Sequence, residues 1–298
     1  MNAGARGKTA GAAGGGAAFE SRYAALYGPR WEGLRQSLLR PPPPVPYGGG
    51  LTLPYYLDRA SVLAALSPRL PAGSGVILDA CAAPGGKSLV IASRMGPGTE
   101  LLSNELSAAR RRRLAAALDK HLDETTRRRV RVSGFDAAAL AARRGERGRF
   151  AAVLLDAPCS SEGHVLRNAA ALEAWTAARP RFLARRQWAL LSAAFLLLAP
   201  GGSLVYATCS INPEENDGVA RRLMEKYGGP GGGNNEGNGN GDESGNDDGN
   251  DGDGGRRETV CVLDRPDFPE GEETAYGRII LPDREAAGPM YVARWRKR

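Results

Sequence analysis

Between residues 76 and 208 the 298-residue chain repeats one local pattern: a short apolar or β-branched run, a polar or glycine-rich turn, and a stretch with helical spacing. Strands that alternate with helices in this way form a mostly parallel sheet with helices on both faces. The run 151–155 is apolar at every position, as expected for a central strand. We therefore predict an α/β fold of Rossmann-like type, with parallel strands over 76–80, 100–104, 130–133, 151–156 and 203–208.

The flanking segments complete the predicted organisation. Residues 1–18 are rich in Gly and Ala and are predicted to be a flexible tail, with a weak organellar transit peptide as the alternative. Residues 19–70 are predicted to form a small helical N-terminal extension, with two short helices over 19–39 and another over 55–66. Residues 71–298 form the main domain, in which 259–263 and 290–295 add two strands to give a seven-stranded sheet with Cys261 in its core.

An acidic segment over 228–257 interrupts the main domain. Residues 228–255 hold seven acids and no Lys or Arg, and they are otherwise almost entirely Gly and Asn. Such a composition has no apolar surface to bury, so we predict a disordered insert that expands one loop of the domain.

The formal net charge of the chain is +7, and the part outside the acidic segment is more strongly basic still. This excess predicts a polyanion partner, most simply a nucleic acid, while solvation of helix faces is the alternative interpretation. Basic residues are concentrated over 110–113, 127–131, 143–149 and 179–186, and at Arg294, Arg296, Lys297 and Arg298.

The cysteines and the hydropathy narrow the class of protein. Four cysteines without a C-x-x-C pair, and two histidines, argue against a metal site and against a disulfide framework. No window approaches the roughly 18 consecutive apolar residues of a membrane span. We predict no metal and no membrane partner.

The first predicted strand runs through a glycine-rich turn into a helix, an arrangement that can hold a nucleotide-like ligand. The segment ends in Gly86-Lys87-Ser88, like a phosphate-binding loop, but Cys81 stands where that motif requires its first glycine. A phosphate-binding ATPase is therefore the weakest of the functions considered. The candidate binding residues of this turn are Cys81, Ala82, Ala83, Pro84, Gly85, Gly86 and Lys87.

Two acids follow the next two strands. An acid at the end of the second strand, here Glu105, can accept hydrogen bonds from both hydroxyls of a ribose. The alternative for Glu105 is an ion pair with Arg110. Asp136 is placed to meet the adenine end of the same ligand, and otherwise would serve only as the N-cap of the next helix.

The remaining candidates are two cysteines at the ends of neighbouring central strands. Asp156-Ala-Pro-Cys159 ends one strand and Ala207-Thr-Cys209-Ser ends the other, so both thiols are expected in one pocket. Either cysteine alone is more often a small hydrophobic core residue. Two of them at equivalent strand ends, one beside an aspartate, favour chemistry over packing.

These motifs, in this order, resemble those of the Sun-domain RNA cytosine-5 methyltransferases. They are Asp-Ala-Cys-Ala-Ala-Pro-Gly-Gly-Lys, Asp-Ala-Pro-Cys and Ala-Thr-Cys-Ser. The resemblance covers about 55–227 and 277–297. It implies a class I methyltransferase fold that uses S-adenosylmethionine, with RNA as the partner. It makes the turn 81–87 the cradle of the methionine and ribose, with Glu105, Arg110, Asp136 and Asp156 completing the cofactor site.

The resemblance also assigns the chemistry. Cys209 would add to carbon 6 of cytosine and so activate carbon 5 for methylation, with the basic pocket around Lys87 stabilising its thiolate. Asp156 would neutralise the charge that builds on the ring, and Cys159 would assist release of Cys209.

Segments 277–282 and 288–291, with the compact N-terminus, look most like the branch that acts on organellar small-subunit ribosomal RNA. Ribosomal RNA is therefore favoured over transfer RNA, and a targeting protein is a candidate partner. A mitochondrion or another organelle is one location considered, and the cytoplasm or nucleus is the other. A non-catalytic RNA-binding ribosome assembly factor is the alternative from a different class.

Overall fold

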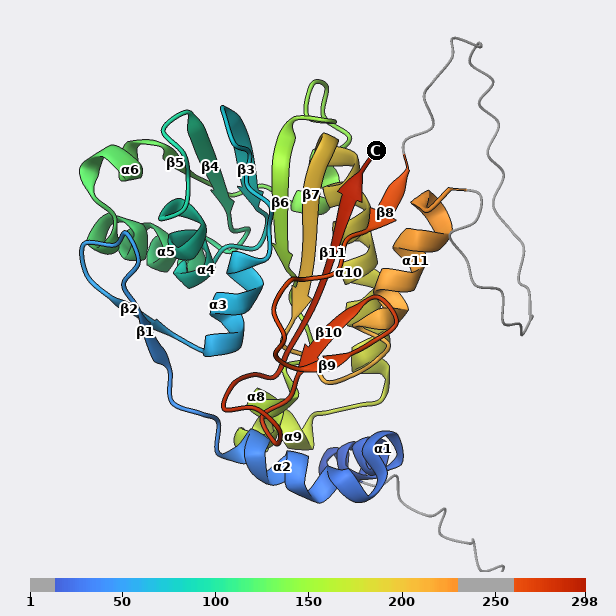
Figure 1. The fold of residues 1–298 in the computed structure, drawn as a ribbon. Coiled ribbons are helices and arrows are strands. Elements are labelled where there is room, and N and C mark those ends of the chain that lie inside the picture. Colours follow the sequence, from blue (N-terminus) through green and yellow to red (C-terminus); the bar gives the residue numbers. More distant parts are fainter. Residues whose placement is uncertain (1–13, 230–259) are drawn as a thin grey trace, which may run out of the picture.

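The computed structural model describes residues 14–229 and 260–298. A twisted sheet passes through the centre of the molecule and helices lie on both of its sides (Figure 1). This is the predicted Rossmann-like architecture. The tail over 1–13 and nearly all of the predicted insert, from residue 230 onward, lie outside the described residues.

The central sheet has nine described strands, two more than predicted. Five are parallel and lie in the order β5-β4-β3-β6-β7, and the antiparallel strands β11, β10 and β9 extend the sheet beyond β7. Strand β8 pairs with the end of β11. The strands are β3 (Gly75–Asp79), β4 (Thr99–Asn104), β5 (Val130–Ser133), β6 (Phe150–Asp156), β7 (Leu198–Thr208), β8 (Cys261–Leu263), β9 (Glu272–Glu273), β10 (Gly277–Ile280) and β11 (Met290–Lys297).

Alternate residues of the central strands enter two separate cores. Leu78 and Val153 pack in the core under α10 and α11, whereas Ile77 and Leu154 pack in the core under α3, α4 and α5. Both faces of β6 are therefore buried, as its apolar sequence predicts. The helices of this domain are α3 (Arg59–Leu66), α4 (Gly86–Ala92), α5 (Ala108–His121), α6 (Glu124–Arg128), α7 (Ala137–Leu140), α8 (Glu162–Arg167), α9 (Ala169–Glu173), α10 (Ala178–Leu197) and α11 (Asp217–Tyr227).

The predicted helix over 55–66 is wrong in its first residues. Strand β2 (Tyr55–Leu57) pairs there with β1 (Val45–Tyr47) in a small antiparallel sheet, and α3 begins at Arg59. The side chain of Asp58 accepts a hydrogen bond from the backbone N–H of Ala60, which caps the helix at this point.

The N-terminal extension shares a core with the main domain instead of standing apart. It consists of α1 (Gly15–Tyr27), the 3₁₀ turn η1 (Gly28–Arg30) and α2 (Trp31–Leu39), and lies beside α8 and α9 (Figure 1). Buried Phe19 and Leu38 pack with Val165 and Trp175 of the main domain. Helix α1 begins at Gly15, so the predicted tail over 1–18 is wrong for its last four residues.

Part of the basic C-terminal cluster is structural, which corrects its assignment to a polyanion surface. The Arg294 side chain is buried in β11 and its guanidinium donates to Asp264 and Asp267. The ammonium of Lys297, also buried, donates to the carbonyls of Phe195 and Leu198. Neither side chain is available to a polyanion.

The two ends of the segment 230–259 meet at the sheet. A Cβ placed on Gly229 would lie 3.2 Å from Cγ1 of Val260. Val260 in turn exchanges two backbone hydrogen bonds with Arg298. Cys261 follows and is buried in the core, as predicted.

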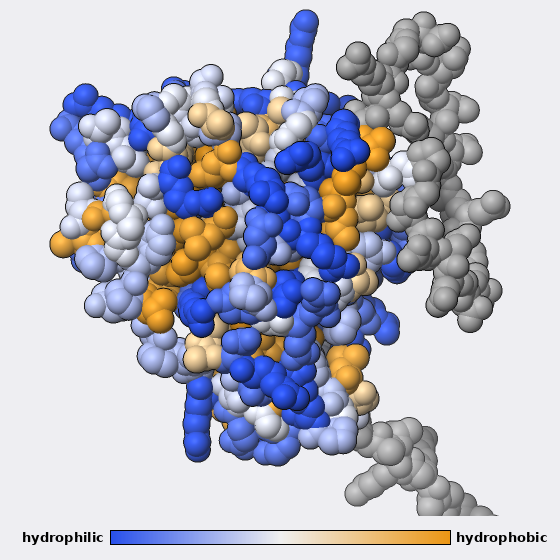
Figure 2. Space-filling view, in the orientation of Figure 1, coloured by the Kyte–Doolittle hydropathy of each residue, from blue (hydrophilic) through white to orange (hydrophobic). Residues whose placement is uncertain are grey.

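Hydrophilic side chains cover most of the face drawn in Figure 2, and hydrophobic side chains reach the surface between them in separate groups. Within 14–229 and 260–298, no helix combines the length and the apolar character needed to cross a membrane.

Candidate active site

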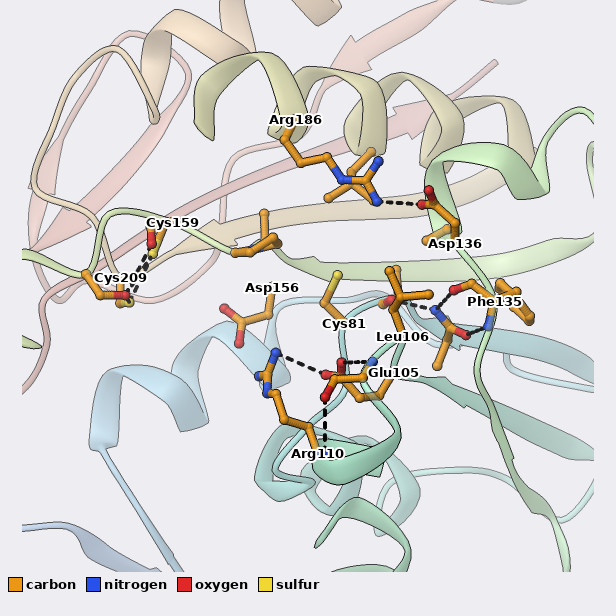
Figure 3. A pocket seen from close by; sticks show the side chains of 18 residues that line it. Cys81, Glu105, Leu106, Arg110, Phe135, Asp136, Asp156, Cys159, Arg186 and Cys209 are labelled. Carbon is orange, nitrogen blue, oxygen red and sulfur yellow. Dashed lines mark hydrogen bonds and ion pairs between the residues drawn. The ribbon is translucent and has the colours of Figure 1, made fainter. Parts of the chain in front are cut away.

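A cavity of about 430 Å³ opens at the carboxyl edge of the parallel strands, and we call it the main pocket. The thiols of Cys159 and Cys209 lie at one end of it and Asp136 at the other (Figure 3). The edge therefore brings together most of the residues predicted from the sequence: Cys81, Glu105, Arg110, Asp136, Asp156, Cys159 and Cys209.

The turn between β3 and α4 is built around two glycines. Gly85 has a φ of 121°, a backbone angle that residues other than glycine rarely adopt. A Cβ on Gly86 would lie 2.8 Å from the Tyr55 ring. Buried Asp79 anchors the turn by accepting a 2.6 Å hydrogen bond from Ser88, and burial raises the pKa of Asp79 to about 7. Burial likewise raises the pKa of Cys81, which keeps this thiol neutral.

Only Cys81 of the predicted cradle lines the main pocket. An adjacent cavity of about 230 Å³ is lined by the other side of the turn, and Asp156 belongs to both cavities. Gly85 lines neither. The turn residues at the adjacent cavity are Ala82, Ala83, Pro84, Gly86 and Lys87.

Glu105 lines the main pocket and forms the ion pair with Arg110 that was the alternative prediction, while its role towards a ribose stays a prediction. Its carboxylate is 4% exposed, lines the main pocket and forms a 3.1 Å ion pair with Arg110. The backbone N–H of Ser107 donates to its other oxygen, and Arg110 also donates to the carbonyl of Ala83. Arg110 therefore links the acid to the glycine-rich turn.

Asp136 also has two roles. It caps α7 by accepting from the backbone N–H of Ala138, and it accepts a 2.6 Å hydrogen bond from Arg186 of α10. The Arg186 guanidinium holds the pKa of Asp136 below its ordinary value. Asp136 and Arg186 close the end of the main pocket away from the thiols (Figure 3).

Asn104, just before Glu105, is a residue that the sequence analysis missed. Its buried amide donates to the carbonyls of Ala80 and Phe135, and its oxygen accepts from the backbone N–H of Phe135. One side chain thereby ties together the loops after β3, β4 and β5. The signal in the sequence was an amide at a strand end, which accepts and donates at once.

Lys87 forms its direct contacts with Asp156 and Ser61. Its ammonium contacts Asp156 at 2.8 Å and Ser61 at 3.2 Å, while no hydrogen bond joins it to Cys209 among the described residues. Burial opposes its charge, but the combined attraction of Asp156, Cys209 and Asp79 outweighs burial and raises the pKa of Lys87. Its direct partner is the aspartate, and Cys209 also attracts it, so stabilisation of the thiolate by the basic pocket around Lys87 stays a prediction.

The support of Cys209 comes from two neighbours. Its sulfur lies 3.1 Å from the sulfur of Cys159 and 3.1 Å from the hydroxyl of Ser161. Hydrogen bonds from these groups, that of Cys159 first, lower the pKa of Cys209 despite its burial. The same contact with Cys209, together with burial, raises the pKa of Cys159. The contact therefore makes Cys209 the more acidic thiol of the pair and Cys159 the less acidic one.

Ser161 was not predicted, and its backbone explains why. It has a φ of 53°, the only positive φ of a non-glycine residue within the described ranges. This left-handed conformation turns its hydroxyl towards both sulfurs, at 3.5 Å from Cys159. Nothing in the run Cys-Ser-Ser-Glu indicates that conformation.

Two buried carboxylates hold the turns that carry the thiols. Glu215 accepts hydrogen bonds from the backbone N–H of Ser160 and from Gln187, and Glu162 accepts from Tyr23 and from the backbone N–H of Ile211. The hydroxyl of Ser210 lies 3.0 Å from both acids. Burial raises the pKa of Glu162 to about 7 and also raises that of Glu215. Sequence reasoning missed both, because burial of a glutamate leaves no local pattern.

Chemically, the site combines a thiol of lowered pKa, a thiol of raised pKa beside it and a half-buried lysine–aspartate ion pair. It can therefore form and break a covalent bond to carbon while it holds a proton nearby. Within the described residues, no group of three His, Cys, Asp or Glu side chains is placed to hold a metal ion.

Comparison with protein families gives a match over more than half of the chain. The family described as 16S rRNA methyltransferase RsmB/F matches residues 66–229. This range contains the glycine-rich turn, the three acids of the main pocket and both thiols.

Two curated relatives carry the name ribosomal RNA small subunit methyltransferase F. The protein from Escherichia coli is 38% identical over 175 residues, which are 58% of this chain and 35% of that protein. The protein from Klebsiella pneumoniae is 40% identical over 151 residues, 51% of this chain and 30% of that protein. The chain thus spans about a third of the length of these relatives.

Solved structures show the same fold. A methyltransferase homolog protein from Pyrococcus horikoshii superposes with a TM-score of 0.65 at 19% identity, covering 93% of each chain. NSun6 from Pyrococcus horikoshii, solved with SFG, superposes with a TM-score of 0.58 at 21% identity. The superposition covers 84% of this chain and 54% of that one.

Proposed function

The chain belongs to the RsmB/F family of 16S rRNA methyltransferases, and from this membership we propose that it is an S-adenosylmethionine-dependent RNA cytosine-5 methyltransferase that works through a covalent adduct on Cys209. One observation carries the proposal. The Cys209 sulfur, with the Cys159 sulfur 3.1 Å away, lies in a pocket that also contains Asp156, which is paired with Lys87.

The main pocket suits the methyl donor. Its volume of about 430 Å³ lies within the ~300–1,000 Å³ of small-molecule sites. The Glu105 carboxylate can accept from ribose hydroxyls, while Asp136 lies at the end away from the thiols. When bound, S-adenosylmethionine supplies an electrophilic methyl group.

Cys209 acts first. Its thiolate adds to carbon 6 of the cytosine, so that a carbon–sulfur bond forms and the π electron pair of the ring moves to carbon 5. The hydrogen bonds from Cys159 and Ser161 raise the thiolate population at neutral pH. The target base must leave any stack to reach this sulfur.

The Lys87–Asp156 pair controls the charge on the ring. Addition at carbon 6 builds negative charge on the ring, centred on N3 and O2. The pair holds a proton between the Lys87 ammonium and the Asp156 carboxylate, 2.8 Å apart. It donates that proton to N3 during addition and takes it back when the ring becomes aromatic again.

Cys159 acts last. Once the Cys209 sulfur is bonded to carbon 6, its negative charge is gone, and with it the main cause of the raised pKa of Cys159. Cys159 can then give up its own proton to solvent and, as a thiolate, accept the proton from carbon 5, directly or through water. The electron pair of the broken C5–H bond forms the C5–C6 double bond and expels the Cys209 thiolate.

Ribosomal RNA is the proposed substrate, supported by the names of the family and of its curated relatives. The chain spans about a third of the length of those relatives, so ribosomal RNA is a proposal for this chain, and a targeting protein remains part of that proposal. Action in an organelle stays a prediction from the sequence.

The test incubates the protein with tritiated S-adenosylmethionine and total cellular RNA. Label is then measured in 5-methylcytidine and in size-separated RNA. Cys209→Ala should abolish label but keep donor binding in calorimetry, whereas Cys159→Ala should accumulate a denaturation-resistant RNA adduct. Cys261→Ala, at a core cysteine away from the pocket, is the matched control and should methylate normally. Label in transfer RNA would support the proposed reaction but identify transfer RNA as the substrate. Label produced by Cys209→Ala would refute the covalent adduct on Cys209.

A further inference from the structure

A second cavity, of about 220 Å³, touches the reactive thiol, and we call it the acceptor groove. It shares two residues with the main pocket, Cys209 and Ser161. Its other walls come from the N-terminal extension, from α8 and from the loop before β11. They are formed by Ser37, Leu38, Pro41, Gly163, His164, Arg167, Gly288 and Pro289.

We propose that the acceptor groove binds the sugar-phosphate backbone of the RNA strand beside the target base, with Arg167 and His164 as the phosphate ligands. The inference rests on the proposed function, because it takes RNA as the substrate. It adds the path by which the strand reaches Cys209.

Charge separates the acceptor groove from the main pocket. The main pocket is lined by three carboxylates, those of Glu105, Asp136 and Asp156, and its two arginines, Arg110 and Arg186, are already paired with two of them. None of the residues that line the acceptor groove is acidic, and two of them carry nitrogen donors. A polyanionic strand that must place one base at Cys209 therefore meets favourable charge on this side.

The two donors are available for a ligand. Arg167 is exposed, and across 14–229 and 260–298 it forms no ion pair. One of its guanidinium nitrogens donates to the carbonyl of Leu38, and its remaining N–H groups form no other protein hydrogen bond in those ranges. His164 is exposed too, and its ring makes no hydrogen bond within the same residues. Such a fork of N–H groups is the usual recognition element for a phosphate.

The size of the acceptor groove indicates which part of a nucleotide it takes. Its volume of about 220 Å³ is below the ~300 Å³ at which pockets begin to enclose whole small molecules. This fits one ribose-phosphate unit, with the base turned to the thiols. Proline faces of Pro41 and Pro289 provide apolar contact for the sugar.

A glycine in α8 makes the arrangement possible. A Cβ on Gly163 would lie 3.1 Å from Nη1 of Arg167 and 3.5 Å from Cδ2 of Leu38. Its absence lets α2 pack against α8 while the guanidinium passes between them. The N-terminal extension is thereby part of the proposed RNA site and not only a cover for the core.

The test measures binding of a fluorescein-labelled 12-nucleotide single-stranded RNA of mixed sequence to the full chain, by anisotropy over a series of salt concentrations. Arg167→Ala and His164→Ala should each weaken binding, Arg167→Ala by about tenfold. Loss of the Arg167 charge should also reduce the slope of log K against log salt by roughly 0.7. The affinity for S-adenosylmethionine should not change.

Controls separate a ligand role from a structural one. Arg167→Lys keeps the charge and should retain most of the affinity, and His164→Ala removes no side-chain hydrogen bond within the described residues. Arg131→Ala, at an exposed arginine of β5 outside the acceptor groove, is the matched control and should bind as the wild type. If both Arg167→Ala and His164→Ala bound RNA with the affinity and salt slope of the wild type, the proposed role of the acceptor groove would be overturned. The proposed function would not be affected by that result. Failure of the wild-type chain to bind RNA would count against the proposed function as well.

Discussion

The sulfur atoms of Cys159 and Cys209 lie 3.1 Å apart, one in the turn after β6 and the other directly after β7. They meet because β6 and β7 are adjacent parallel strands, whose turns leave the same edge of the sheet. The contact makes the two thiols unequal, since it lowers the pKa of Cys209 and raises that of Cys159. In the proposed mechanism, this difference in acidity distinguishes the nucleophile from the later proton acceptor before any RNA binds.

The first prediction concerns the difference in pKa between Cys159 and Cys209. Replacing Cys159 by Ala removes the strongest hydrogen bond to the Cys209 sulfur, so the pKa of Cys209 should rise by roughly one pH unit. Cys159→Ser keeps a donor and should cause a smaller rise. The measurement is the rate of Cys209 alkylation by iodoacetamide against pH, followed by peptide mass spectrometry. An unchanged profile in Cys159→Ala would show that the sulfur contact does not support the thiolate.

The second prediction separates the hydroxyl of Ser161 from its strained backbone. Ser161→Ala and Ser161→Gly both remove the hydrogen bond to Cys209, so both should raise its pKa in the same alkylation assay. Only Gly adopts a φ of 53° freely, so Ser161→Gly should be more stable than Ser161→Ala by about 1 kcal/mol in urea unfolding. If thiol reactivity followed stability across the two variants, the backbone and not the hydroxyl would control Cys209.

The third prediction concerns charge control on the base. Asp156→Asn keeps the shape of the side chain but removes the partner of Lys87, so turnover at saturating donor should fall roughly 10²- to 10³-fold. The pKa of Lys87 should fall as well, because burial then acts without the attraction of Asp156. Asp136→Asn is the comparison, since this residue lies at the far end of the main pocket. It should raise the KM for the donor while kcat stays within a few-fold, and equal losses of kcat in both variants would contradict the separate roles.

The fourth prediction is a dependence of stability on pH. The folded-state pKa values of Glu162 and Asp79 are about 7, above the ordinary values of 4.5 and 3.8. Between about pH 4.5 and 7 the folded state therefore binds more protons than the unfolded state, so the free energy of unfolding falls as pH rises. The loss is on the order of 3 kcal/mol for each fully shifted group.

Urea unfolding at pH 5, 6, 7 and 8 measures this slope. Glu162→Gln should flatten it, even though the backbone N–H of Ile211 loses its acceptor and absolute stability drops. Asp136, whose pKa is lowered by Arg186, contributes only below about pH 4 and should not disturb the window. A free energy that rises between pH 5 and 7 would exclude buried, protonated carboxyls as its determinant.

The fifth prediction concerns the glycine-rich turn. Gly85 has a φ of 121°, and a Cβ there would lie 3.2 Å from Ala117. Gly85→Ala should therefore cost about 1–3 kcal/mol and weaken donor binding measured by calorimetry. Gly33→Ala in α2 is the matched control, because its Cβ meets nothing within 4 Å. This control should be neutral or stabilising by up to about 1 kcal/mol, and an equal effect at both positions would remove the special role of the turn.

Features that depend on chain-local patterns could be predicted from the sequence. Apolar runs such as 151–155 identified the buried strands, and topology then brought Glu105, Asp136 and Cys209 to one edge. The short strand β10 was missed because Gly-Arg-Ile-Ile shows no alternation, and only its pairing with β11 makes it a strand. Asp58, a visible N-cap residue, could have separated β2 from α3.

Features that depend on side-chain packing could not be predicted. The ion pair of Lys87 with Asp156 was not predicted, because the sequence does not say which of several charged groups this lysine will meet. The conformation of Ser161 and the pairing of Glu162 with Tyr23 arise from contacts between distant segments. In both cases tertiary packing, and not local preference, sets the chemistry of the thiols.

The contact between Gly229 and Val260 makes the chain between them a closed loop whose ends are already fixed by α11 and the sheet. Closure entropy depends only weakly on length, so replacing residues 230–259 with a five-residue linker would gain only about 1.5 kcal/mol. This junction is therefore a suitable insertion site. New chain termini, a fluorescent reporter or an affinity tag can be introduced there without altering the strands that carry the thiols.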